Sequence, residues 1–177
     1  GIIALDSYKD GKVIGQKIPE NFKTCSLHEI YHVHKIIGDK KLIYRTEIVK
    51  QFPLYPIFEG EKFVPLGSLY LLIDQKYKLL PLNEVVCIVE YLPDGSSKNI
   101  IKQYKKNPLG FKYSRILEMK YSKSSLYTFT RAIHFVSSSM ISKKYNILKE
   151  NPKKTATILA LPFGFLLYLY ICYKNKK

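Results

Sequence analysis

The chain has 177 residues, which fits one domain of ordinary size, and 46% of them are hydrophobic, a normal fraction for a globular protein. Its 29 lysines and arginines outnumber 14 acidic residues, and the net charge of +15 favours anionic partners such as nucleic acid, anionic lipid or phosphate-bearing substrates. The three cysteines (Cys25, Cys87 and Cys172) show no CxxC spacing, which argues against a disulfide framework and a thiolate metal site and favours a reducing compartment. The apolar start, residues 1–5, lacks an initiator Met and a basic segment, so we interpret the chain as a fragment entered at a strand, without a signal peptide.

Short strand and helix signals alternate over the first fifty residues. We expect strands at 1–5, 12–14 and 41–44, with a polar turn at 6–11. Ser26 suits the N-cap of a short helix that runs to about His34 and stops near Gly38. A helical turn is expected at 45–50.

A proline-containing extended loop at 52–58 precedes a longer helix signal. From Glu61 the apolar residues recur at helical spacing, with Pro65 in the first turn, at Phe63, Leu66, Leu69, Tyr70 and Ile73. Strands are then expected at 77–80 and 84–91, and the second suits a buried position because it contains Val85, Val86, Ile88 and Val89. Beyond residue 96 only helices are expected, at 99–106, 108–121 and 124–147.

The last apolar segment, Thr155–Tyr173, contains no charged residue and has lysines on both sides. Its length lies at the lower edge of the ~17–25 residues that cross a bilayer, and Pro162 and Gly164 are expected to kink it. Its aromatic residues suit a membrane interface, and the flanking lysines suit anionic headgroups. We therefore expect an interfacial or membrane-dipping helix first, a true span second, and a helix packed on its own domain third.

One motif, His28-Glu29-Ile30-Tyr31-His32, matches the HExxH pattern of zinc peptidases. In those enzymes the two histidines bind the metal and the glutamate activates water. Here the motif would lie in the first turn after Ser26 and has no third ligand at a suitable spacing. A zinc-dependent hydrolase therefore stays an alternative to polar surface histidines.

Two acidic patterns are candidates for a site. Asp39, in a turn before a short strand, and Arg45, after it, could present a carboxylate and a guanidinium to a phosphate or a sugar hydroxyl; a solvated turn and a surface Arg45–Glu47 pair are the alternative. Glu59 and Glu61 flank a glycine at the expected start of an apolar helix. A carboxylate there could act as a general base, or could simply complement the helix dipole.

Five segments in order carry a resemblance: GIIALDSYKDGKVIG, GDKKLIYRTEIVKQFP, PIFEGEKFVP, NEVVCIVEYLPDGSSKN and KNPLGF. Together, from Gly1 to about Tyr121, they resemble the second half of family 2 glycosyltransferases that build surface polysaccharides. The resemblance implies an α/β chain with a partial GT-A (Rossmann-like) fold. From the resemblance together with the helical patterns and the apolar last segment, we expect three regions: an acceptor-side half at 1–98, a helical extension at 99–150 and an apolar membrane-associated helix at 151–177.

The resemblance also implies an inverting reaction, a nucleotide-diphosphate sugar donor and a divalent metal, Mg or Mn. In the family an Asp-x-Asp motif holds metal and nucleotide; this chain has no such motif, so most metal ligands are expected outside it and the chain alone is expected to be inactive. The family's base comes from a Glu-Asp pair. Glu61 matches the Glu, while Lys62 stands where the Asp is expected, so Glu61 is the expected base and Glu59 the reserve. Asp39 and Arg45 would line the acceptor or diphosphate side, and Tyr91 and Asp94 would lie in the loop that covers the site.

The chain contains neither Gln-x-x-Arg-Trp nor any tryptophan, so the resemblance favours transfer of a single sugar over a processive synthase. The expected acceptor is a glycan or a lipid-linked acceptor such as a lipid diphosphate. The positive charge and the last apolar segment then favour the anionic, cytoplasmic face of the membrane as the working place. A non-enzymatic basic module that binds nucleic acid is the other alternative. Nucleic acid is not an expected partner, because many tyrosines fall in helix-spaced apolar patterns that core packing explains.

Overall fold

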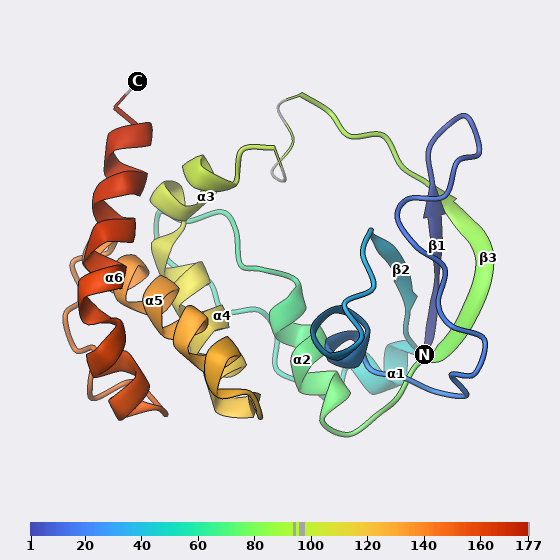
Figure 1. Ribbon diagram of the computed structural model, residues 1–177, viewed down its shortest axis with the longest axis horizontal. Helices are drawn as coiled ribbons and strands as arrows, with labels where there is room; N and C mark the ends of the chain where they lie inside the picture. The colour runs from blue at the N-terminus through green and yellow to red at the C-terminus, as the bar shows by residue number, and fades with distance from the viewer. Residues whose placement is uncertain (94, 96–97, 177) are drawn as a thin grey trace. The chain divides into compact units, whose positions relative to one another are not determined.

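The computed structural model describes residues 1–93, 95 and 98–176, and they form a mixed α/β protein (Figure 1). Contacts divide the chain into two compact units. Unit 1 comprises Gly1–Leu54 and Leu69–Leu92, and unit 2 comprises Tyr55–Ser68 and Pro93–Lys177. The expected α/β class is confirmed at this level, while the division into 1–98, 99–150 and 151–177 stays a prediction.

Unit 1 is built on a small mixed sheet with the strand order β2-β1-β3. The central strand, β1 (Ile2–Ser7), pairs antiparallel with β2 (Lys40–Ile43) and parallel with β3 (Leu80–Ile88). The run Ile-Ile-Ala-Leu in β1 is almost fully buried, as a strand with neighbours on both sides requires. Residues 12–14, expected as a strand, join the sheet through a single bridge between Ser7 and Val13.

The third strand differs from its prediction in two ways. One strand, Leu80–Ile88, takes the place of the two expected at 77–80 and 84–91, and a bulge interrupts its register with β1 between Pro81 and Val85. At this bulge the Asn83 amide exchanges two hydrogen bonds with the backbone of Ile18, at 2.9 and 2.7 Å. The predicted burial of the apolar side chains is wrong for Val85, Val86 and Ile88, which are exposed because β3 lies at the edge of the sheet.

The helical turn after Ser26 is confirmed and contains the π-helical segment η1 (Glu29–Val33). Ser26 and Glu29 form a capping box: the Glu29 N–H donates to the Ser26 hydroxyl at 3.1 Å, and the Ser26 N–H donates to the Glu29 carboxylate at 2.7 Å. Ile30 inserts into the core of unit 1, which also contains Ile3, Ile18, Cys25, Ile36 and Leu79. The short helix α1 (Thr46–Val49) matches the expected helical turn.

The helix expected to begin at Glu61 is shorter than predicted. Helix α2 (Gly67–Asp74) begins after Pro65, and residues 61–65 are not helical. A proline disfavours helical geometry in the residue before it, and the Lys62 N–H is engaged elsewhere, donating to the Asn107 side chain at 2.9 Å. Glu61 is therefore not at the start of α2.

Unit 2 consists mainly of four helices: α3 (Ile100–Lys106), α4 (Pro108–Tyr121), α5 (Ser125–Ile141) and α6 (Lys154–Lys174). Met119, Phe135, Val136 and other apolar residues of α4, α5 and α6 form its core. Helix α5 ends at Ile141, earlier than the predicted 147, and Lys143 just beyond it has a left-handed backbone with φ of 56°.

Helix α6 packs on α5 along one narrow stripe and exposes most of its apolar surface. The buried residues are small or medium (Thr157, Ala160, Gly164 and Ile171), and the expected kink positions, Pro162 and Gly164, lie inside one continuous helical segment. Large apolar side chains such as Leu159, Phe163 and Leu166 are exposed. By length and composition, α6 is able to cross a membrane.

Candidate functional site

Glu61 lies at the N-terminus of a helix, but the helix is α4 and not α2. Its carboxylate accepts hydrogen bonds from the backbone N–H groups of Leu109 at 2.7 Å and of Gly110 at 2.8 Å. These N–H groups belong to the first turn of α4, where no intrahelical acceptor exists. The Glu61 carboxylate thus satisfies two backbone N–H groups at the positive end of the α4 helix dipole.

The local sequence explains how Glu61 reaches α4. Pro108 opens α4, and the preceding Asn107 accepts the Lys62 N–H at 2.9 Å. Gly110 permits a close approach, because a Cβ there would lie 2.2 Å from the carbonyl oxygen of Phe63. The chain from Glu61 to Phe63 is thus pinned along the beginning of α4.

Glu61 also lines a pocket of about 350 Å³ within unit 2. Most of the lining is apolar or aromatic: Tyr55, Pro56, Ile57, Phe58, Phe63, Val64 and Leu66, together with Lys62. The Tyr55 hydroxyl donates to the carbonyl oxygen of Leu66 at 2.8 Å. A mostly apolar pocket of this size with a few polar groups is typical of a small-molecule site.

The carboxylate of Glu61 has capacity left for a ligand. A carboxylate offers about four lone-pair positions, and the α4 N–H groups use two of them. The other positions can accept a hydrogen bond from a hydroxyl in the pocket. The fixed orientation and the spare acceptor capacity supply the geometry through which a general base receives a proton.

In unit 1 the structure brings together Asp39 and Tyr91, which are 52 residues apart in the sequence: the Tyr91 hydroxyl donates to the Asp39 carboxylate. This hydrogen bond, with burial second, raises the pKa of Tyr91 far above its usual range. Tyr91 is therefore a neutral donor at physiological pH, committed to Asp39.

Two buried ionisable residues, Asp6 and Lys40, lie close enough to Asp39 to interact with it electrostatically, and neither was singled out from the sequence. Burial raises the pKa of Asp6, an effect that Lys41 opposes and Asp39 reinforces, and the Asp6 Oδ1 atom is buried without a hydrogen-bond partner among the described residues. Lys40 donates to three backbone carbonyls, including Gly38 at 3.1 Å, and burial lowers its pKa. The sequence did contain a signal for Asp6: it directly follows the apolar residues Ile2–Leu5, and functional sites in α/β proteins gather at the carboxyl ends of strands.

The remaining predicted residues are more isolated. Glu59 is exposed beside Gly60, and Arg45 is exposed at the start of α1. Asp94 lies outside the described residues. Glu59 and Glu61 belong to unit 2, whereas Asp39, Arg45 and Tyr91 belong to unit 1.

The HExxH motif lies on the turn that contains η1, and its glutamate has a structural task. Besides the capping box with Ser26, the Glu29 carboxylate binds the Lys78 ammonium at 2.8 Å, and this ion pair is the largest cause of its lowered pKa. The rings of His28 and His32 lie 4.9 Å apart, centre to centre. Within the described residues no group of three or more His, Cys, Asp or Glu side chains is placed to hold a metal ion.

Comparison of the chain with models of known protein families, with curated proteins and with solved structures finds no match.

Proposed function

We propose that the protein is the acceptor-side portion of a membrane-associated family 2 glycosyltransferase with a partial GT-A fold. The reaction is the inverting transfer of one sugar from a nucleotide-diphosphate sugar to a hydroxyl acceptor in surface-polysaccharide synthesis. The observation that carries the proposal is the Glu61 carboxylate, oriented by two N–H groups of α4 at a largely apolar pocket.

In this mechanism the acceptor lies in the pocket with its hydroxyl against Glu61. As the hydroxyl oxygen attacks the anomeric carbon of the donor, its proton passes to a free lone pair of the Glu61 carboxylate. The new glycosidic bond forms on the face opposite the bond that breaks, and the nucleoside diphosphate leaves with that bond's electron pair. Apolar and aromatic side chains, such as Phe58 and Phe63, line the pocket beside the acceptor.

The exposed edge strand β3 supports the proposal that the chain is one portion of a larger enzyme, in which further structure covers or extends the sheet of unit 1. Five apolar side chains of β3 are exposed: Leu80, Leu82, Val85, Val86 and Ile88. An exposed apolar edge strand is usually covered or paired in a finished protein, because it otherwise promotes aggregation. The nucleotide-binding half, with its Asp-x-Asp motif, would supply that cover.

The divalent metal that the resemblance implies does not fit this chain. The described part of the chain offers no set of three suitable ligands, so ligands for such a metal would have to come mostly from the nucleotide-binding half. Asp39 and Arg45 remain candidates for the acceptor or diphosphate side. Helix α6 would hold the enzyme at the cytoplasmic face, near a glycan or lipid-linked acceptor.

The proposal is tested with the full-length protein in detergent with Mg²⁺ or Mn²⁺, by screening a panel of nucleotide-diphosphate sugars for nucleoside diphosphate release and for a glycosylated product by mass spectrometry. We expect turnover of one donor, unaffected by His28→Ala. No turnover of any donor, together with zinc bound by the parent and lost in His28→Ala, would replace the transferase with the zinc-hydrolase alternative.

A further inference from the structure

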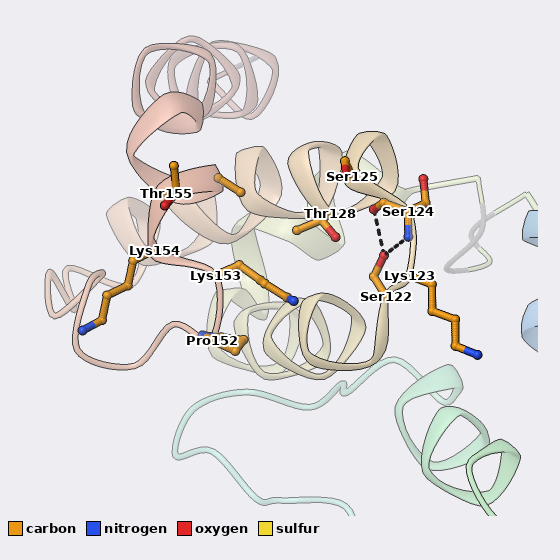
Figure 2. A pocket seen from close by; sticks show the side chains of 10 residues that line it. Ser122, Lys123, Ser124, Ser125, Thr128, Pro152, Lys153, Lys154 and Thr155 are labelled. Carbon is orange, nitrogen blue, oxygen red and sulfur yellow. Dashed lines mark hydrogen bonds between the residues drawn. The ribbon is translucent and has the colours of Figure 1, made fainter.

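A second cavity, of about 440 Å³, lies in unit 2 between the beginnings of α5 and α6 (Figure 2). Its walls come from residues 122–125 and 128 on one side and from residues 152–156 on the other. Three lysines line it, Lys123, Lys153 and Lys154, and no acidic residue does. Figure 2 shows the Lys153 ammonium group among the lining side chains, while those of Lys123 and Lys154 point away from them, so the positive charge at the cavity comes mainly from Lys153.

The N-terminus of α6 faces this cavity without a cap. Its N-cap residue is Lys153, which makes no capping hydrogen bond through its side chain, and its first turn contains no acid. The first-turn N–H groups, of Lys154, Thr155 and Ala156, have no acceptor among the described residues, and all three residues line the cavity. The positive charges of Lys153 and Lys154 interact unfavourably with the positive end of the α6 helix dipole, and a bound anion would offset this interaction.

Thr128 supplies a second and independent observation. It is only 7% exposed, it lines the cavity, and its hydroxyl makes no hydrogen bond within the described part of the chain. Figure 2 shows this hydroxyl among the other lining side chains. By contrast, the neighbouring Ser124 is committed as the N-cap of α5, accepting the Tyr127 N–H at 3.3 Å. The Thr128 hydroxyl oxygen is not fully enclosed but is open to the cavity, where it can donate a hydrogen bond to a ligand.

Free N–H groups, ammonium groups and a hydroxyl are the donors that bind phosphate oxygens. The position of the cavity indicates the source of that phosphate. Helix α6 leads away from it with an exposed apolar surface, and when such a helix enters a bilayer its end lies at the level of the headgroups.

We propose that this cavity binds the phosphate of an anionic phospholipid headgroup. The phosphate would take hydrogen bonds from the first turn of α6 and from Thr128, and it would neutralise part of the charge of the lysines. The inference rests on the membrane association of α6 that the proposed function includes, but it does not depend on sugar transfer.

The test uses the full chain in a nonionic detergent, titrated in mixed micelles with short-chain phosphatidylglycerol. Bound lipid is counted by native mass spectrometry and followed by the ³¹P chemical shift. Parallel titrations use short-chain phosphatidylcholine, whose headgroup is zwitterionic, and inorganic phosphate. We expect saturable binding of about one phosphatidylglycerol, and weak binding of the other two probes.

Two variants with the same charge change separate the cavity from the general surface. The cavity variant carries Lys123→Gln, Lys153→Gln and Lys154→Gln, and the control carries Lys120→Gln, Lys144→Gln and Lys149→Gln, which are exposed lysines of unit 2 outside the cavity. We expect the cavity variant to bind phosphatidylglycerol at least roughly tenfold more weakly, since each lysine near anionic headgroups contributes on the order of a tenfold or smaller factor. The control should bind like the parent.

Thr128→Val keeps the shape and removes only the hydroxyl, and we expect it to weaken binding roughly two- to tenfold. Equal losses in the two lysine variants, or unchanged binding by Thr128→Val, would reduce the site to unspecific surface charge and overturn the inference. Inorganic phosphate bound as tightly as phosphatidylglycerol would also overturn it, because the site would then take free phosphate. These readouts are made in micelles, so failure of sugar transfer leaves them unaffected.

Discussion

The Glu61 side chain has two roles, since it caps helix α4 and is the proposed general base. Its carboxylate holds the first turn of α4 through Leu109 and Gly110, which lie 48 and 49 residues further along the chain, and the same carboxylate faces the pocket. Any substitution at this position therefore changes stability as well as the candidate site. Glu59, only two residues away, is exposed and shares neither contact.

We predict that Glu61→Gln lowers the free energy of unfolding by on the order of 1 to 2 kcal/mol, because an amide satisfies only one of the two α4 N–H groups and turns its own donor toward the other. Glu59→Gln should change it by less than about 0.5 kcal/mol, as expected for an exposed side chain. Urea denaturation of the two variants in detergent measures both values. Equal stability of the two would show that Glu61 does not hold α4.

Asp74 makes unit 1 sensitive to pH. It accepts the His28 N–H at 3.1 Å, yet its Oδ1 is buried without a partner among the described residues, and burial raises its pKa from 3.8 to about 6. The folded state then binds this proton more tightly than the unfolded chain does. The stability that this group contributes is full below pH 4 and is lost as the pH rises through about 6.

We predict that Asp74→Asn, which keeps an acceptor for the His28 N–H but carries no charge, gains stability relative to the parent as the pH rises from 4 to 7. The relative gain should be on the order of 2 kcal/mol, since one pKa unit corresponds to about 1.4 kcal/mol. Denaturation of both proteins at pH 4, 5, 6 and 7 gives the difference directly. A difference that does not vary with pH would contradict the shifted pKa.

At the scale of elements, local signals predicted much of the fold. The Ser26 cap, the Pro108 start of α4 and the apolar segment that became α6 are all encoded within a few residues, and each is present. The errors arose where long-range contacts decide the outcome. Residues 61–65 are held against the start of α4 by hydrogen bonds such as that from the Lys62 N–H to Asn107, and they do not form a helix. The β3 bulge depends on the hydrogen bonds between Asn83 and the distant Ile18 backbone.

The candidate site was predicted in part for the same reason. The prediction that Glu61 opens the helix that follows it is wrong, because α2 begins only at Gly67, and nothing local in the sequence indicated that its carboxylate would cap the distant α4 instead. The contact between Asp39 and Tyr91 joins residues far apart in the sequence, and only the resemblance grouped them. Asp6 was missed because its burial depends on neighbours from other segments.

The packing of α5 against α6 depends on Gly164. A Cβ at this position would lie 2.5 Å from the Val136 side chain and 3.0 Å from the Ile133 carbonyl oxygen. We predict that Gly164→Ala destabilises unit 2 by on the order of 1 to 3 kcal/mol, because the two helices must move apart. Gly67→Ala is the matched control, since a Cβ there meets no atom within 4 Å. Thermal unfolding of the pair tests this, and equal melting temperatures would contradict the close helix crossing.

For the molecule as a whole, the proposed membrane association rests on the net charge of +15 and on the exposed apolar side chains of α6. We predict that Leu159→Lys with Leu166→Lys weakens partition into phosphatidylcholine–phosphatidylglycerol vesicles, because a charge in the bilayer core costs about 2.5–3.5 kcal/mol. Leu54→Lys with Leu126→Lys adds the same charge at exposed residues outside α6 and should not weaken it. Vesicle flotation compares the two, and equal flotation would show that α6 does not enter the bilayer.

The central claim is that Glu61 acts as the general base of a sugar transfer, and the most direct test is the kcat of the full-length enzyme carrying Glu61→Gln or Glu59→Gln with its identified donor. Loss of a general base lowers rates by roughly 10²- to 10⁴-fold, so we predict a fall of that size for Glu61→Gln and a rate near the parent's for Glu59→Gln. Both variants are assayed under conditions in which denaturation curves show them folded. A parental rate for folded Glu61→Gln would contradict the account and leave Glu61 as the cap of α4 alone.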